Sequence, residues 1–154
     1  MALRREISRV LDPGHILMLD CRTKRAVFER MIECLSISPV VGDGEELSEA
    51  IFYREALMST GIGLGIGVPH VRLESVEKPI MCVAVCHNAI ADYESLDGEA
   101  VRLVFMIAAG KGQHVEHIRL LASISSRLKD EELRRDIVNA PDAETVHRIL
   151  VGEA

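Results

Sequence analysis

Apolar runs separated by turn residues divide the chain into alternating short strands and longer helices. Residues 15–21 follow a proline-glycine turn and predict a strand. Residues 79–88 and 101–109 are almost continuously apolar, which is typical of central strands buried on both faces of a sheet. A further short strand is expected near residues 66–68.

Helical spacing of apolar side chains predicts the remaining elements. We expect helices over residues 24–35, 45–59 and 114–139, the last of them broken near residue 129, and a final helix over 143–150. The alternation of strands and helices indicates an α/β fold with helices packed on both faces of the sheet. The length of the chain predicts a single domain over residues 1–154.

The segment 61–70 alternates four glycines with apolar residues and ends in Pro69 and His70. If it is extended, one of its faces carries no side chains, and another group can approach the backbone there. Pro69 fixes one dihedral and so sets the angle at which His70 follows. The alternative is a strand packed under a helix, with His70 an ordinary surface residue.

Composition restricts the class of protein. Apolar residues make up 48% of the chain and charged residues 27%, as in soluble globular proteins. A net charge of −6 and the absence of Trp disfavour a nucleic-acid partner. No apolar run is long enough to span a membrane, and the N-terminus lacks the apolar core of a signal peptide. We therefore expect a cytoplasmic protein whose four cysteines are small buried thiols.

Four short blocks resemble one known family. They are Arg54-Glu55, Thr60-Gly61-Ile62-Gly63, Gly67-Val68-Pro69-His70 and Glu116-His117-Ile118-Arg119-Leu120-Leu121-Ala122. Together they are similar to enzyme IIA of the fructose, mannitol and nitrogen-regulatory branch of the bacterial phosphotransferase system (the type-2 domain). The resemblance places the core of the domain at about residues 8–152 and implies a mixed sheet of about five strands, no cofactor and no metal. It also implies that His70 accepts a phosphoryl group from a phosphocarrier protein of the HPr or NPr type.

His117 is the second candidate for chemistry. Leu121, Ile124 and Leu128 follow it at helical spacing, which places it on the inward face of the first helical turn. The N–H groups and the dipole of a helix N-terminus favour a phosphate. The alternative is a histidine at the edge of the core, bonded to a backbone carbonyl. The resemblance favours a role in stabilising the transferring group.

Arg54 is the third candidate. It shares a predicted helix face with Leu47, Ile51 and Met58, and a charge on an apolar face needs a partner. A guanidinium can bind a phosphate or form a structural ion pair with a buried acid, and both remain open.

Backbone groups of the glycine segment are the remaining candidates for phosphate contact, at Thr60, Gly61, Gly63 and Gly67. For Thr60 alone, a helix-capping hydrogen bond is the simpler interpretation.

Two positions depart from the family pattern. Val71 stands where a glycine usually follows the histidine, and this bulkier residue is expected either to narrow the approach to His70 or to change the choice of partner. Gly110 stands where a proline usually ends the preceding strand.

Three functions remain open. The absence of a fused IIB, IIC or carrier domain in the sequence slightly favours a nitrogen-regulatory IIA that binds regulatory target proteins. The first alternative is a sugar-specific IIA that passes phosphate to the cysteine of a IIB domain. The second is a non-catalytic binding module that retains the fold.

Overall fold

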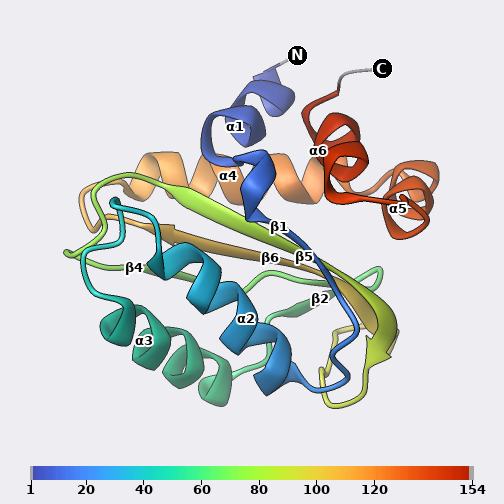
Figure 1. The fold of residues 1–154 in the computed structure, drawn as a ribbon, viewed down its shortest axis with the longest axis horizontal. Coiled ribbons are helices and arrows are strands. Elements are labelled where there is room, and N and C mark those ends of the chain that lie inside the picture. Colours follow the sequence, from blue (N-terminus) through green and yellow to red (C-terminus); the bar gives the residue numbers. More distant parts are fainter. Residues whose placement is uncertain (1, 153–154) are drawn as a thin grey trace.

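The structure, a computed structural model, describes residues 2–152. Within these residues, helices cover both faces of one mixed sheet (Figure 1). The helices are α1 (Ala2–Val10), α2 (Lys24–Ser36), α3 (Gly44–Leu57), α4 (His114–Arg127), α5 (Glu131–Val138) and α6 (Ala143–Val151), with a short 3-10 helix at Pro13–His15. The strands are β1 (Ile16–Leu19), β2 (Gly61–Gly63), β3 (Ile66–Gly67), β4 (His70–Arg72), β5 (Ile80–Ile90) and β6 (Val101–Ala109).

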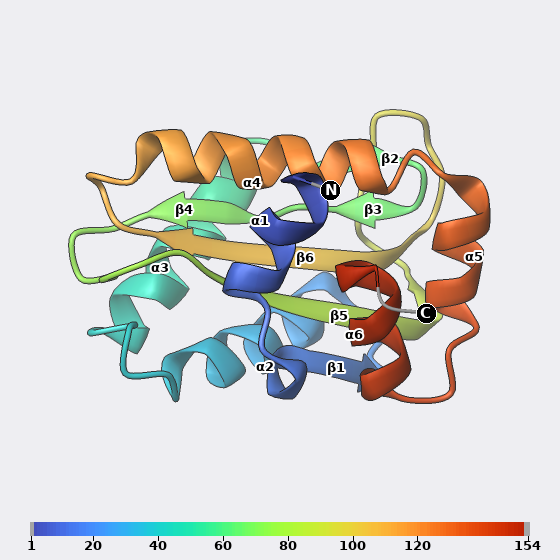
Figure 2. The same ribbon diagram turned by 90° about the horizontal axis from the view of Figure 1, so that it is seen from above.

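The sheet is built around the antiparallel pair β5 and β6. Strand β1 is parallel to β5 on one side, and the short strands β3 and β4 are both parallel to β6 on the other. Figure 2 shows β4 and β3 end to end along the same edge of β6, with α4 passing over them. The segment that carries His70 is therefore held against a central strand that is buried at every residue except Arg102.

Two apolar layers hold the sheet between its helices. One core cluster joins α2 and α3 to one face of β5 and β6, and the other joins α1, α4, α5 and α6 to the opposite face. Both central strands contribute buried residues to both clusters, as the continuous apolar runs predicted. The predicted α/β class with helices on both faces is confirmed.

The predicted helix starts are confirmed by their caps. The side chains of Thr23 and Asp142 accept hydrogen bonds from the N–H groups of Ala26 and Thr145, at 3.2 and 2.8 Å. Asp130 caps α5 in the same way, which explains the predicted break near residue 129. Helix α1, at the N-terminal end of the described residues, was not predicted.

The predicted apolar face of α3 was partly wrong. Leu47 and Ile51 are buried, but Met58 lies beyond the helix end and is 66% exposed. The next residue on the buried stripe is Glu55, only 8% exposed, and not Arg54. The chain therefore buries the carboxylate of Glu55 on the face where helical spacing had placed Arg54.

The glycine segment is a hairpin and not one extended strand. Gly63 pairs with Ile66 across the two-residue turn Leu64-Gly65, in which φ is 60° and 76°. Positive φ at both central residues is the geometry of a type I′ turn, whose twist matches that of the strands it joins. The turn reverses the chain, so the expected single glycine face does not exist.

Candidate functional site

His70 begins β4 at the edge of the sheet, where it pairs with Ile107 of β6, and its side chain is half-buried. Its Nδ1 lies 2.7 Å from the carbonyl oxygen of Val68. A carbonyl can only accept, so Nδ1 carries the proton and donates it. In the neutral ring the lone pair is then on Nε2, the nitrogen that remains free to act as a nucleophile.

His117 faces His70 from the first turn of α4. The ring centroids are 5.3 Å apart and the ring planes are inclined by 55°. His117 is only 4% exposed, as its place on the inward helix face predicted, and its Nδ1 is buried with no hydrogen-bond partner. Such orphaned polar atoms are rare in folded proteins, and a catalytic role or a bound water or ion is among their explanations.

Burial keeps His117 uncharged. Desolvation, with smaller contributions from the charges of His70, Arg72 and His114, lowers the pKa of His117 from 6.5 to about 4. At neutral pH this ring is therefore uncharged, and it can form hydrogen bonds beside His70 without placing a second positive charge there.

Arg54 and His70 line the same cavity of about 320 Å³, which is walled mainly by apolar side chains. The Arg54 guanidinium donates to the carbonyl of Met58 at 3.0 Å, at the end of α3. The buried acid that could have been its structural partner, Glu55, is paired instead with Lys24 at 3.1 Å. Arg54 is thus held at the rim of the His70 cavity by a neutral carbonyl.

Thr60 is fully engaged within the protein. Its N–H and its hydroxyl both donate to Glu55, at 2.9 and 2.6 Å, and its hydroxyl is 2.6 Å from that of Tyr93. Its carbonyl accepts from the N–H of Val68 at 3.0 Å. Glu55 and Tyr93 were not predicted as site residues; the signals for Glu55 were its place in the Arg54-Glu55 block and on the buried spacing of α3.

The glycines are approached by the chain itself. A Cβ on Gly67 would collide with the Tyr93 ring and hydroxyl, and one on Gly61 would collide with the Glu94 carbonyl. Gly63 has a φ of 98° and lies beside Asp97, whose carboxylate accepts from the N–H of Leu64 at 2.8 Å. The loop that joins β5 to β6 therefore packs directly against the backbone of these glycines.

The two departures from the family pattern have separate consequences. Val71 points to the face of the sheet opposite His70 and packs against the α2–α3 core, so the expected narrowing of the approach to His70 was wrong. Gly110 donates its N–H to the side chain of Gln113 at 2.7 Å, just before α4. A proline at this position would have no N–H for that bond.

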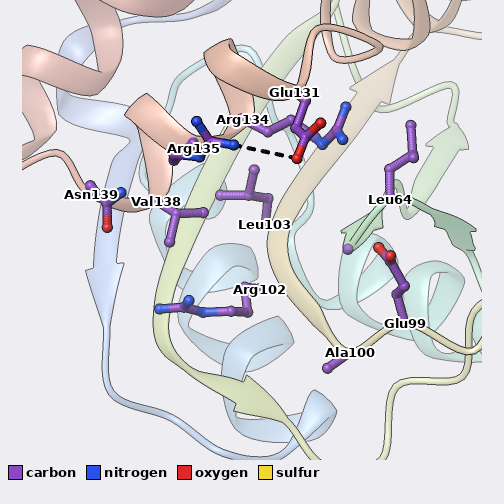
Figure 3. A pocket seen from close by; sticks show the side chains of 11 residues that line it. Leu64, Glu99, Ala100, Arg102, Leu103, Glu131, Arg134, Arg135, Val138 and Asn139 are labelled. Carbon is purple, nitrogen blue, oxygen red and sulfur yellow. Dashed lines mark hydrogen bonds and ion pairs between the residues drawn. The ribbon is translucent and has the colours of Figure 1, made fainter.

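A second cavity, of about 370 Å³, lies away from His70 between the hairpin turn and α5 (Figure 3). Its arginines have partners within the protein. Arg102 donates to the carbonyls of Cys86 and His87, Arg134 donates to the carbonyl of Leu128, and Arg135 pairs with Glu131 at 3.4 Å. We therefore place the candidate chemistry at the His70 cavity.

The cysteines follow the expectation only in part. Cys82 and Cys86 are fully buried, whereas Cys21 and Cys34 are partly exposed. Among the described residues, no cluster of three or more His, Cys, Asp or Glu could hold a metal ion. Within residues 2–152 there is also no helix both long and apolar enough to cross a bilayer.

Comparison with known proteins points to one family. Residues 9–152 match the model described as phosphoenolpyruvate-dependent sugar phosphotransferase system, EIIA 2. A nitrogen regulatory protein of Pseudomonas aeruginosa is 33% identical over 147 residues, 94% of each chain. The fructose-specific EIIABC component of Bacillus subtilis is 35% identical over 134 residues, which are 87% of this chain but only 21% of that protein.

Solved structures agree with the sequence matches. The nitrogen regulatory protein IIA-Ntr of Neisseria meningitidis superposes with a TM-score of 0.84 at 26% identity, covering 94% of this chain and 98% of that one. IIA mannitol of Escherichia coli gives a TM-score of 0.76 at 26% identity, covering 91% and 98%. The chain therefore belongs to the type-2 EIIA family of the phosphoenolpyruvate-dependent sugar phosphotransferase system.

Proposed function

We propose that this chain is a phosphoryl carrier that accepts a phosphoryl group on His70 from a phosphocarrier protein of the HPr or NPr type. The observation that carries the proposal is the bond between His70 Nδ1 and the Val68 carbonyl. This bond leaves the Nε2 lone pair free on a ring that lines the cavity.

The proposed step is an in-line displacement at phosphorus. The Nε2 lone pair of His70 forms the new N–P bond while the N–P bond in the carrier's donor histidine breaks. The nitrogen of the donor histidine keeps the electron pair of the broken bond. Positive charge develops on the His70 ring during attack. The Val68 carbonyl, which accepts from Nδ1, stabilises that charge without moving a proton. Transfer of this kind depends mostly on positioning and on charge stabilisation.

Two side chains would stabilise the transferring group. His117, neutral and 5.3 Å from His70 between ring centroids, is suited to hydrogen-bond a phosphoryl oxygen without electrostatic repulsion of His70. Arg54, which lines the cavity together with His70, supplies a guanidinium that matches phosphate geometry. In this proposal Thr60 positions the site through its internal bonds, and it does not contact phosphate itself.

Between the two branches of the family we favour the nitrogen-regulatory one. The match to the Pseudomonas nitrogen regulatory protein extends over 94% of both chains. A sugar-specific role is the second candidate, because the fructose-specific component of Bacillus subtilis is equally similar and IIA mannitol of Escherichia coli has been solved in complex with phosphorylated IIB. In either role we expect a cytoplasmic protein.

The test is incubation of the purified chain with phosphorylated HPr and, separately, phosphorylated NPr, followed by peptide mapping of acid-labile phosphate. The proposal expects label on the peptide that contains His70. Absence of uptake from both carriers, with binding retained, would favour a non-catalytic module. Transfer onward to a IIB cysteine would favour the sugar branch, and retention of the group with altered partner binding would favour the regulator.

A further inference from the structure

Glu55 is a buried acid close to the site that the proposed transfer step does not use. It is 8% exposed and continues the α3 stripe formed by Leu47 and Ile51, which are fully buried. A carboxylate is stable in such a place only when it is paired and hydrogen-bonded. Its partners therefore show which groups it holds in position.

Glu55 holds Thr60 at two points. Its Oε2 accepts from the N–H of Thr60 at 2.9 Å and from Lys24 Nζ at 3.1 Å, and its Oε1 accepts from the Thr60 hydroxyl at 2.6 Å. The carboxylate can only accept, so Thr60 donates its single hydroxyl proton to Glu55. The hydroxyl of Tyr93, 2.6 Å away, must then be the donor to Thr60.

Tyr93 keeps that proton and is itself held in place. Burial, and secondarily the charge of Glu55, raises the pKa of Tyr93, so the phenol stays protonated. Lys24 Nζ lies 4.9 Å from the centroid of its ring, and Phe28 meets the ring edge-on at 5.8 Å. The ring and hydroxyl fill the space that a side chain would occupy at Gly67.

These contacts end at the carbonyl that orients His70. Thr60 accepts from the N–H of Val68 at 3.0 Å, and the carbonyl of Val68 accepts from His70 Nδ1 at 2.7 Å. The backbone of Val68 is thus held by Thr60, which Glu55 positions, and it follows Gly67, against which Tyr93 packs.

We propose that Lys24, Glu55 and Tyr93 are positioning residues for His70. Through Thr60 and Gly67 they fix the Val68 carbonyl, which keeps the His70 proton on Nδ1 and the lone pair on Nε2. The inference rests on the proposed function of His70, but the tautomer it predicts exists in the unphosphorylated protein.

The test compares Glu55→Gln, which keeps the shape but removes the charge, and Tyr93→Phe, which removes one hydroxyl, with Tyr53→Phe as the matched control. Tyr53 lies on α3 and is 70% exposed. Three quantities are measured on each full-length protein: the melting temperature, the ¹⁵N shifts of the His70 ring, and the rate of His70 phosphorylation by the small donor phosphoramidate. The small donor removes any effect on carrier docking.

In the wild type we expect the Nδ1–H tautomer of His70. In Glu55→Gln we expect a mixture of tautomers and a fall in rate of roughly 10–100-fold, because small misplacements of a reacting group are costly. Tyr93→Phe should show a smaller change of the same kind, and Tyr53→Phe none.

A melting temperature that falls while tautomer and rate stay unchanged would overturn the inference and make the network purely structural. If Glu55→Gln does not fold, the His70 tautomer and the phosphorylation rate of Tyr93→Phe test the inference instead. A wild type that shows the Nδ1–H tautomer, lost in the variants, but takes up no phosphate would contradict the proposed function and leave the positioning role supported.

Discussion

The rings of His70 and His117 face each other at 5.3 Å between centroids, one at the start of β4 and the other in the first turn of α4. They are 47 positions apart in the chain (117 − 70). They meet because β4 lies parallel to β6 and α4 follows β6 directly, passing back over that edge of the sheet. The pair therefore depends on the register of β4 on β6.

Replacing His117 with alanine should slow transfer without removing the acceptor. Loss of one group that stabilises a transition state typically costs roughly 10²–10³ in rate. Rapid-quench kinetics with phosphorylated carrier would measure the effect, with His87→Ala as the control because His87 is exposed on β5. Unchanged kinetics in both directions would reduce His117 to a buried packing residue.

Protonation of His117 should destabilise the fold in acid. Its pKa is 6.5 when unfolded and about 4 when folded, so the unfolded chain binds more protons between these values. The contribution of His117 is therefore full above about pH 6.5 and is lost as the pH falls toward 4, by about 2 kcal/mol after partial screening. Urea unfolding of wild type and His117→Gln across this window would show it. Parallel pH profiles for the two proteins would disprove the assignment.

Arg54→Lys should lower the transfer rate and leave stability nearly unchanged. Lysine keeps the charge but loses the planar fork that fits a phosphate. No large stability loss is expected, because the buried acid Glu55 is paired with Lys24 and not with Arg54. Melting temperature and transfer rate would be measured on the same protein, with Arg25→Lys on the exposed side of α2 as control. Normal transfer with a large drop in melting temperature would rule out the phosphate-binding role.

Gly67→Ala should destabilise the protein by about 1–3 kcal/mol, because the new methyl group would collide with Tyr93 in a packed interior. Gly112→Ala is the matched control, since a Cβ there meets nothing within 4 Å. Chemical denaturation measures both. Equal stability of the two variants would mean that Tyr93 does not pack against the glycine backbone as described.

The sequence predicted the elements that depend on local signals. The continuous apolar runs predicted β5 and β6, the capping side chains of Thr23 and Asp142 marked helix starts, and helical spacing placed His117 on a buried face. Each of these features depends on only a few neighbouring residues, so it can be predicted without the tertiary structure.

Features that depend on distant partners were not predictable. Glu55 is buried because Lys24 and Thr60 reach it, and the glycine segment turns back at Leu64-Gly65 although its alternation is that of a strand. Tyr93 carried no signal at all, since its part in the site arises only when the β5–β6 loop folds onto Gly67. The resemblance to the family pointed to His70 but could not reveal what orients it.

The most direct test of the account is phosphate uptake by His70→Ala, measured against wild type and His87→Ala with the same phosphorylated carrier. Acid-labile label is expected on the wild type and on His87→Ala, and none on a folded His70→Ala protein. Full labelling of His70→Ala would contradict it and would move the acceptor to another residue.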